Sequence, residues 1–331
     1  MRLIEIVTDA GHSDTLSSVA DQHEITDYWW GAPAEDGRRA FRMLVNDSAR
    51  QPVMDALQKL FGGSDNYRIV VLPIDTSLPR EPEDETGVAK ATREELYTQI
   101  DKGARPDSNY ILLVVLSTLV AAIGLIEDNV AVIIGAMVIA PLLGPIIALA
   151  FSSSLGDGEL MWRAAKTAIS GLGLAFTVAL VIGVIWPVDI GRGQMLVASS
   201  EILARTDVGM DGMALALASG AAAVLSLTTG LSTTLVGVMV AVALLPPTAT
   251  TGMLLGAGHV ELAMGALLLL AVNVVCVIVA AKVVFVSKGV APRTWYERSK
   301  ARQSTLLSGA VWAGLLVVLV LIVVARQRVL L

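Results

Sequence analysis

Eleven residues in or beside long apolar stretches of this sequence have either a polar side chain that could bind a ligand or a tendency to break helices. Proline removes a backbone donor and clashes with the preceding helical turn, so it kinks or breaks a helix. Hydroxyl and amide groups can rescue the carbonyls that a break leaves free, or they can hold a small ion. The candidate residues for binding an ion or a small polar solute are Pro141, Gly144, Pro145, Pro246, Pro247, Thr248, Thr250, Thr251, Asn273, Asp128 and Asn129.

The prolines lie in two stretches that resemble each other. Gly135–Pro145 and Gly237–Pro247 match at an offset of 102 positions, with six identities in eleven residues. The same offset aligns Glu159 with Glu261 at the start of the following apolar segment. We therefore predict that both stretches are broken helices at membrane depth, where only surrounding protein or a water-filled cavity can satisfy the freed backbone groups.

Each polar candidate has a structural and a functional interpretation. Asp128 and Asn129 could coordinate a cation near a pore mouth, or they could form a polar turn between helices. Asn273 could join helices by a hydrogen bond or belong to a binding site. Thr248, Thr250 and Thr251 could bond to freed carbonyls, although their place next to the proline pair favours lining a site. Lys282 is expected to extend its charge to the membrane interface.

An acidic front part precedes a long apolar part. Residues 1–107 hold 20 acidic and 12 basic side chains, whereas residues 108–331 hold 10 and 12. The start of the chain lacks an apolar run of signal-peptide length, and the lone Cys276 excludes an intramolecular disulfide. Seven segments approach the roughly 20 residues that a bilayer requires. They are residues 108–126, 130–151, 165–186, 211–229, 232–255, 262–285 and 305–325, of which the Ala- and Gly-rich fourth could instead be re-entrant or interfacial.

The front part predicts a small α+β domain. Strands at 2–8, 25–30, 41–46 and 67–74 and helices at 13–22 and 52–61 follow the order βαββαβ, that of ferredoxin-like domains. We expect this domain to occupy residues 1–75. An acidic linker with a pre-membrane helix at 92–104 should fill residues 76–107, and the transmembrane domain should begin at residue 108.

The distribution of Lys and Arg predicts orientation. The linker Ser287–Arg302 carries five basic residues against one acidic residue, which indicates the cytoplasmic side. Counting spans backwards places the N-terminal domain in the cytoplasm and the C-terminus outside. The repeat then comprises three spans at 108–186 and three at 211–285, followed by a final span at 305–325. An odd number of spans in each unit inverts the second unit relative to the first, as in many secondary transporters.

The segment Asn129–Ile147, with the later Leu244-Leu245-Pro246-Pro247 and the ferredoxin-like front, resembles the uncharacterised hydrophobic membrane proteins grouped as domain of unknown function 389 (DUF389). The resemblance covers most of residues 1–300. It implies a polytopic prokaryotic membrane protein, and it implies no substrate or active residues.

Two functions are consistent with these features. The first is a multi-pass cell-membrane transporter or channel for an ion or small polar solute, with a regulatory cytoplasmic domain. The second is a membrane-anchored sensor or scaffold whose ferredoxin-like domain binds a ligand or partner. We found no catalytic motif and expect no enzyme activity, cofactor, metal site or nucleic-acid partner, although an intramembrane enzyme is not excluded. The lipid bilayer is the expected partner, and homo-oligomers are possible.

Overall fold

The computed structural model describes residues 1–46, 49–61, 66–74, 93–186, 200–229, 233–290 and 309–325. The chain separates into two compact units, Met1–Glu95 and Leu96–Leu331. The expected linker at 76–91 lies outside the described residues.

The first unit is a four-stranded antiparallel sheet with two helices. Its elements are β1 (Arg2–Thr8), α1 (Ser13–Gln22), β2 (Tyr28–Trp30), β3 (Arg39–Val45), α2 (Arg50–Phe61) and β4 (Arg68–Pro73). A short 3-10 helix, η1 (Ala10–His12), lies between β1 and α1. The strand order is β2-β3-β1-β4, so each helix connects two strands that have another strand between them. The predicted βαββαβ order is confirmed. Alternate residues of β1 and β3, such as Ile4, Ile6 and Phe41, are fully buried against α1 and α2 because side chains of a strand alternate between faces.

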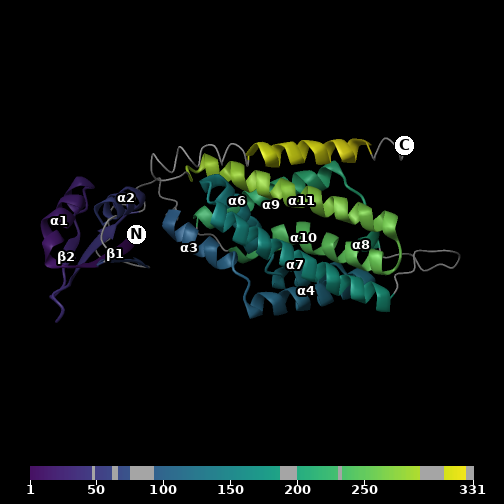
Figure 1. Ribbon diagram of the computed structural model, residues 1–331, viewed down its shortest axis with the longest axis horizontal. Coiled ribbons are helices and arrows are strands. Elements are labelled where there is room, and N and C mark those ends of the chain that lie inside the picture. Colours follow the sequence, from purple (N-terminus) through teal and green to yellow (C-terminus); the bar gives the residue numbers. More distant parts are fainter. Residues whose placement is uncertain are drawn as a thin grey trace. The chain divides into compact units, whose positions relative to one another are not determined.

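The second unit is a bundle of helices (Figure 1). Its elements are α3 (Arg93–Gly103, shared with the end of the first unit), α4 (Ser108–Ile126), α5 (Val130–Ile139), α6 (Leu143–Leu155), α7 (Gly158–Ile185), α8 (Ser200–Leu203), α9 (Met210–Thr229), α10 (Thr233–Gly256), α11 (Val260–Ser287) and a helix at Gly309–Ala325. α10 is the central helix, because it contacts α4, α5, α7, α9 and α11.

Several of these helices have the length and composition of membrane spans. Four of them, α4, α7, α9 and α11, satisfy both criteria, and α5 with α6 forms a fifth candidate that is bent by 56°. The predicted break in the first proline stretch is therefore confirmed, and α9 is a continuous helix of spanning length. The predicted break in the second stretch is wrong, because α10 continues as a helix through Pro246 and Pro247.

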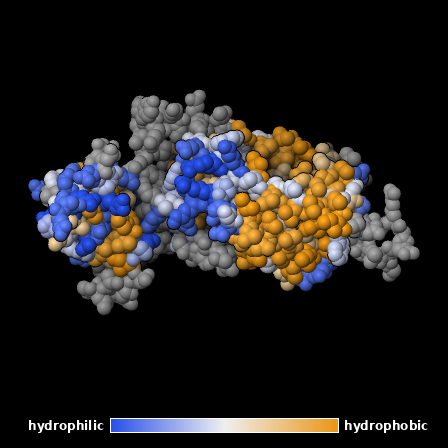
Figure 2. Space-filling view, turned by 60° about the horizontal axis from the view of Figure 1, so that its bottom comes forward, coloured by the Kyte–Doolittle hydropathy of each residue, from blue (hydrophilic) through white to orange (hydrophobic). Residues whose placement is uncertain are grey.

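The surface of the second unit matches an apolar environment. Figure 2 shows a broad hydrophobic surface on this unit, bordered by hydrophilic residues. Large apolar side chains of α4 and α7 such as Leu112, Ile169 and Val184 are exposed. Patches of this size are rare on soluble monomers and fit lipid contact. Trp162 and Trp186, near the two ends of α7, are 62% and 66% exposed, as expected for aromatic residues at the two membrane interfaces.

The two tryptophans give a test of membrane depth. They are 24 residues apart, which corresponds to about 36 Å along a helix and exceeds the roughly 30 Å hydrocarbon core. In variants that retain a single tryptophan, Trp162 and Trp186 should each be quenched most by lipids brominated near the headgroup. A tryptophan introduced by Thr177→Trp, at an exposed position midway along α7, should instead be quenched most by lipids brominated near the chain end. The same quenching depth for all three would contradict a spanning α7.

Candidate functional site

The proline pair of α10 lies within a continuous helix, and a side chain of α11 supplies one of the donors that the prolines lack. Pro247 has no N–H for the carbonyl of Ala243, four residues earlier. The side-chain amide of Asn273 on α11 donates to that carbonyl oxygen at 2.9 Å. The hydroxyls of Thr248 and Thr251 donate to the carbonyls of Leu244 and Pro247, each at 2.7 Å. Asn273 therefore joins α11 to α10 at the position where the proline weakens α10.

Two buried oxygen atoms beside this helix have no hydrogen-bond partner among the residues that the structure describes. They are Oδ1 of Asn273 and Oγ1 of Thr250, on residues that are 6% and 0% exposed. Buried polar atoms are usually paired, so these two oxygens are candidate contacts for a water molecule or a bound solute. Thr250 and Ala243 are seven residues apart on α10, and Asn273 lies at the level of Ala243. The two oxygens are thus about 10 Å apart along the helix rather than in one cluster.

The first proline stretch forms a different kind of site. Ala140 adopts an extended conformation with φ −66° and ψ 121°, and α6 begins after Pro141 and Leu142. Gly144, in the first turn of α6, lies against the last residue of α3. A Cβ on Gly144 would be 3.0 Å from both the Cα and the carbonyl oxygen of Gly103. The start of the broken helix is therefore covered by the end of α3, with the buried Pro145 in the next position.

Asp128 and Asn129 form a structural turn between α4 and α5. Asp128 has a left-handed backbone with φ 54°, and its carboxylate accepts from the Ser200 hydroxyl and the Glu201 N–H, both at 2.8 Å. Asn129 accepts from the N–H of Val132 and caps α5. The 19 residues of α4, about 28 Å of helix, separate this turn from the α3 end of the bundle. The candidate residues thus form three separate groups.

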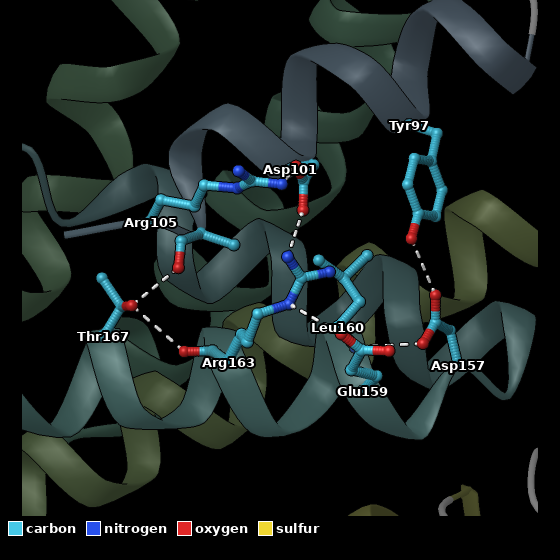
Figure 3. Close-up of polar contacts among 9 residues, drawn as sticks. Tyr97, Asp101, Arg105, Asp157, Glu159, Leu160, Arg163 and Thr167 are labelled. Atoms are coloured by element: carbon cyan, nitrogen blue, oxygen red, sulfur yellow. Dashed lines mark hydrogen bonds and ion pairs between the residues drawn. The ribbon is translucent and has the colours of Figure 1, made fainter.

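A polar cluster between α3 and α7 was not anticipated from the sequence (Figure 3). Asp101 of α3 pairs with Arg163 of α7 at 3.1 Å and with Arg105 at 2.6 Å. The Tyr97 hydroxyl donates to Asp157 at 3.0 Å, and Asp157 also caps α7 through the N–H of Leu160. These contacts attach the amphipathic pre-membrane helix to the start of α7.

Two further contacts complete this attachment. The Thr167 hydroxyl donates to the carbonyl of Ala104 at 2.7 Å, just after α3 ends. Arg163 lies 4.0 Å from Glu159, one turn earlier on α7. Burial, followed by the hydrogen bond to Asp157, raises the pKa of Tyr97, so its hydroxyl remains a donor at neutral pH. The i, i+4 spacing of Asp101 with Arg105 and of Glu159 with Arg163 was the sequence signal of this cluster.

Lys282, which was expected to extend its charge to the membrane interface, instead has a buried side chain that contacts α6. Its side chain is 9% exposed, and its ammonium donates to the Ser153 hydroxyl of α6 at 2.8 Å. Ser153 lies between Ser152 and Ser154, which are also buried. A run of three serines inside an apolar helix was the signal that could have drawn attention to this position.

Comparison with known proteins identifies relatives without assigning an activity. Residues 137–279 match the family model described as "Domain of unknown function (DUF389)". An uncharacterised protein of Methanocaldococcus jannaschii is 34% identical over 285 residues, which cover 86% of this chain and 87% of that protein. No solved structure matches this chain.

Proposed function

The chain belongs to the DUF389 family, and we propose that it is a multi-pass membrane transporter or channel for an ion or small polar solute, built from two inverted three-helix units. In this proposal, α4, α5 with α6, and α7 form one unit, and α9, α10 and α11 form the other. The helix at 309–325 is a seventh span. The N-terminal domain is cytoplasmic and regulatory, and the C-terminus is outside.

The helix boundaries support the repeat. α7 covers 158–185 and α11 covers 260–287, so both boundaries differ by 102 positions. α4 begins at residue 108 and α9 at residue 210, with the same offset. The turns before α7 and α11 also correspond, because Gly156 and Gly258 both adopt left-handed backbones, with φ 71° and 84°. Chance similarity in composition does not account for matching turns.

The directions of the helices support inversion. Gly252 of α10 approaches Phe176 and Leu180 of α7, and Gly256, one turn later, approaches Leu180 and Val184. Contacts that advance together along both helices mean that α7 and α10 run in parallel. α10 and α11 form an antiparallel hairpin, because the turn at Gly258 connects them and Asn273 reaches back to Ala243. α7 and its counterpart α11 therefore run in opposite directions.

A pair of exchanged contacts is the observation that carries the proposal. Gly183 of α7 packs on Met253 of α10, where a Cβ would be 2.2 Å from the Met253 carbonyl oxygen. The positions 102 residues from these, Phe285 of α11 and Phe151 of α6, pack with ring centroids 5.2 Å apart. The contact therefore recurs when each residue is replaced by its counterpart in the other half of the repeat. A two-fold axis that relates the two halves produces such paired contacts. Combined with opposite helix directions, this recurrence favours an axis in the membrane plane, where transporters of this design hold their sites.

Labelling at matched positions tests the inversion. Glu159 and Glu261 correspond in the repeat and are both exposed at the start of a helix. In a Cys276→Ser background, Glu159→Cys and Glu261→Cys should lie on opposite sides of the membrane. A membrane-impermeant maleimide applied to intact cells should then label Glu261→Cys and leave Glu159→Cys unlabelled. Labelling of both or neither would overturn the inverted arrangement.

Flux measurements test transport itself. Proteoliposomes should show protein-dependent permeability to KCl, followed with a potential-sensitive dye, or to glycerol or urea, followed by osmotic swelling. Pro145→Ala and Asn273→Ala should change the rate, since they alter the break and the unpaired amide oxygen between the units. Gly173→Ala, at an exposed position of α7 with no neighbouring atom within 4 Å, is the matched control. Vesicles that remain impermeable to all three probes would contradict transport of small inorganic ions and neutral solutes.

The α3–α7 cluster supports the regulatory part of the proposal. Asp101 and Arg163 are 16% and 34% exposed, so their ion pair is partly shielded from water. A double-mutant cycle with Asp101→Asn and Arg163→Met should give a coupling of about 1–2 kcal/mol in the free energy of unfolding. The exposed pair Asp36–Arg38 in the first unit should give a clearly smaller coupling in the same assay, because water and salt screen exposed charges. Equal couplings would remove the special role of the α3–α7 pair.

One observation favours the sensor or scaffold alternative. In the first unit, the sheet face opposite α1 and α2 carries Trp29 and Leu72, which are 43% and 44% exposed. These two side chains lie on opposite edge strands rather than in one patch, but tryptophan is enriched in binding interfaces, so the exposed Trp29 fits a ligand or partner. A ligand that changes Trp29 fluorescence in the whole chain, combined with impermeable vesicles, would favour this function over transport.

A further inference from the structure

Among the described residues of the second unit, Lys282 is the one charged residue that is more than nine-tenths buried. It lies on α11, five residues before the helix ends, and its ammonium donates to Ser153 on α6. Ionisable groups inside membrane domains are costly to bury and usually mark pathways for ions or substrates. This position therefore requires a functional explanation.

Packing between α6 and α11 does not require a polar pair here. Under the proposed repeat, on which this inference rests, Lys282 corresponds to Leu180 and Ser153 to Leu255. At that matched interface, Gly256 of α10 packs directly on the backbone of Leu180 and Val184. An apolar interface thus suffices in one half of the molecule, whereas the other half has an ammonium and hydroxyls. Residues that depart from the simplest packing are expected at functional sites.

The pair is also connected to the pre-membrane helix. Phe285, one turn after Lys282, packs edge-on against Phe151, and Phe151 packs against Tyr97 of α3 with centroids 6.1 Å apart. Tyr97 in turn binds Asp157 at the end of the α6–α7 turn. An aromatic series therefore leads from α3 to the helix turn that holds Lys282.

We propose that Lys282 and Ser153 bind the anionic group of a solute at the α3 side of the bundle, so that the transported substrate is an anion. An ammonium supplies three N–H donors and a hydroxyl supplies one O–H, and both are donors that carboxylate and phosphate oxygens accept. A phosphate group has the same chemistry whether it belongs to a free solute or to a lipid headgroup.

Binding of inorganic phosphate to the full-length protein tests this site. In nanodiscs of neutral phosphatidylcholine at constant ionic strength, titration calorimetry should detect phosphate binding by the wild type. Lys282→Met should weaken it at least tenfold, and Lys282→Arg should keep it within a few fold. Ser153→Ala should weaken it about threefold or more and provides a second test if Lys282→Met does not fold. Lys166→Met removes an exposed lysine of α7 and should bind as the wild type does.

Nanodiscs that contain phosphatidylglycerol distinguish the two sources. Loss of phosphate binding in these discs, with lipid retained by the wild type and lost from Lys282→Met in native mass spectrometry, would assign the site to a headgroup. Phosphate binding that persists in them assigns it to a solute. The site would be overturned if the wild type bound neither phosphate nor phosphatidylglycerol, or if Lys282→Met bound them as well as the wild type does. Vesicles that remain impermeable to phosphate, combined with Lys282-dependent phosphate binding, would instead refute transport of this anion and leave the site intact.

Discussion

Replacing Gly183 with alanine should destabilise the helical unit by about 3 kcal/mol or more. The new Cβ would lie 2.2 Å from the carbonyl oxygen and 2.7 Å from the Cα of Met253, which are backbone atoms of α10. A backbone cannot move aside as the end of a flexible side chain does, so the two helices must separate. Overpacking of this kind is among the few mechanisms that produce large losses of stability. The measurement is the midpoint of unfolding in mixed detergent micelles.

Gly173 gives the matched control within the same helix. It has no atom within 4 Å of the position where a Cβ would be added. Gly173→Ala should therefore be neutral or should stabilise α7 by about 0.5–1 kcal/mol, because alanine loses less backbone entropy than glycine in a helix. Similar destabilisation by both changes would show that α7 and α10 do not pack backbone to backbone at Gly183.

Replacing Asn273 with leucine should cost about 2 kcal/mol, and this cost should depend on Pro247. Leucine removes the amide that donates to the Ala243 carbonyl, so a buried acceptor loses its partner. In a Pro247→Ala background, residue 247 regains an N–H that can donate to the same carbonyl. Asn273→Leu should then cost less than about 1 kcal/mol. A double-mutant cycle on the free energy of unfolding measures the difference.

The two leucine variants also distinguish structural from functional roles of Asn273. If the amide serves only to repair α10, the double variant Pro247→Ala with Asn273→Leu should recover both stability and flux. If its unpaired Oδ1 also contacts the solute, stability should recover while flux does not. Equal costs of Asn273→Leu in both backgrounds would show that the amide does not compensate for the proline.

Local patterns in the sequence predicted local structure well. The expected strand at Arg2–Thr8, the helix at Ser13–Gln22 and the span at 108–126 have the observed boundaries. Apolar periodicity determines these elements within a few turns of chain. The break after Ala140 was also predictable, because two prolines and two glycines in eleven residues cannot maintain a regular helix.

Features that depend on distant residues were not predictable. Both proline stretches were expected to break, but Asn273 maintains α10, and its counterpart in the first half of the proposed repeat is Gly171, which has no side chain. The first half of the repeat also has Pro141 where the second half has Ala243. Tyr97 finds its partner 60 residues away and Lys282 finds its partner 129 residues away. No local pattern encodes which helix faces meet in the bundle, so the cluster on α3 and the buried lysine became evident only in the fold.

The exposed length of α7 makes the protein sensitive to the thickness of the bilayer that surrounds it. From Lys166 to Trp186, α7 presents about 30 Å of helix to its surroundings, equal to the usual hydrocarbon thickness of a bilayer. A thinner bilayer would tilt this helix, as hydrophobic mismatch does in general. Because Gly183, Gly252 and Gly256 bring the backbones of α7 and α10 together, α10 must tilt with it. Bilayer thickness therefore acts directly on the proline-bearing helix at the centre of the bundle.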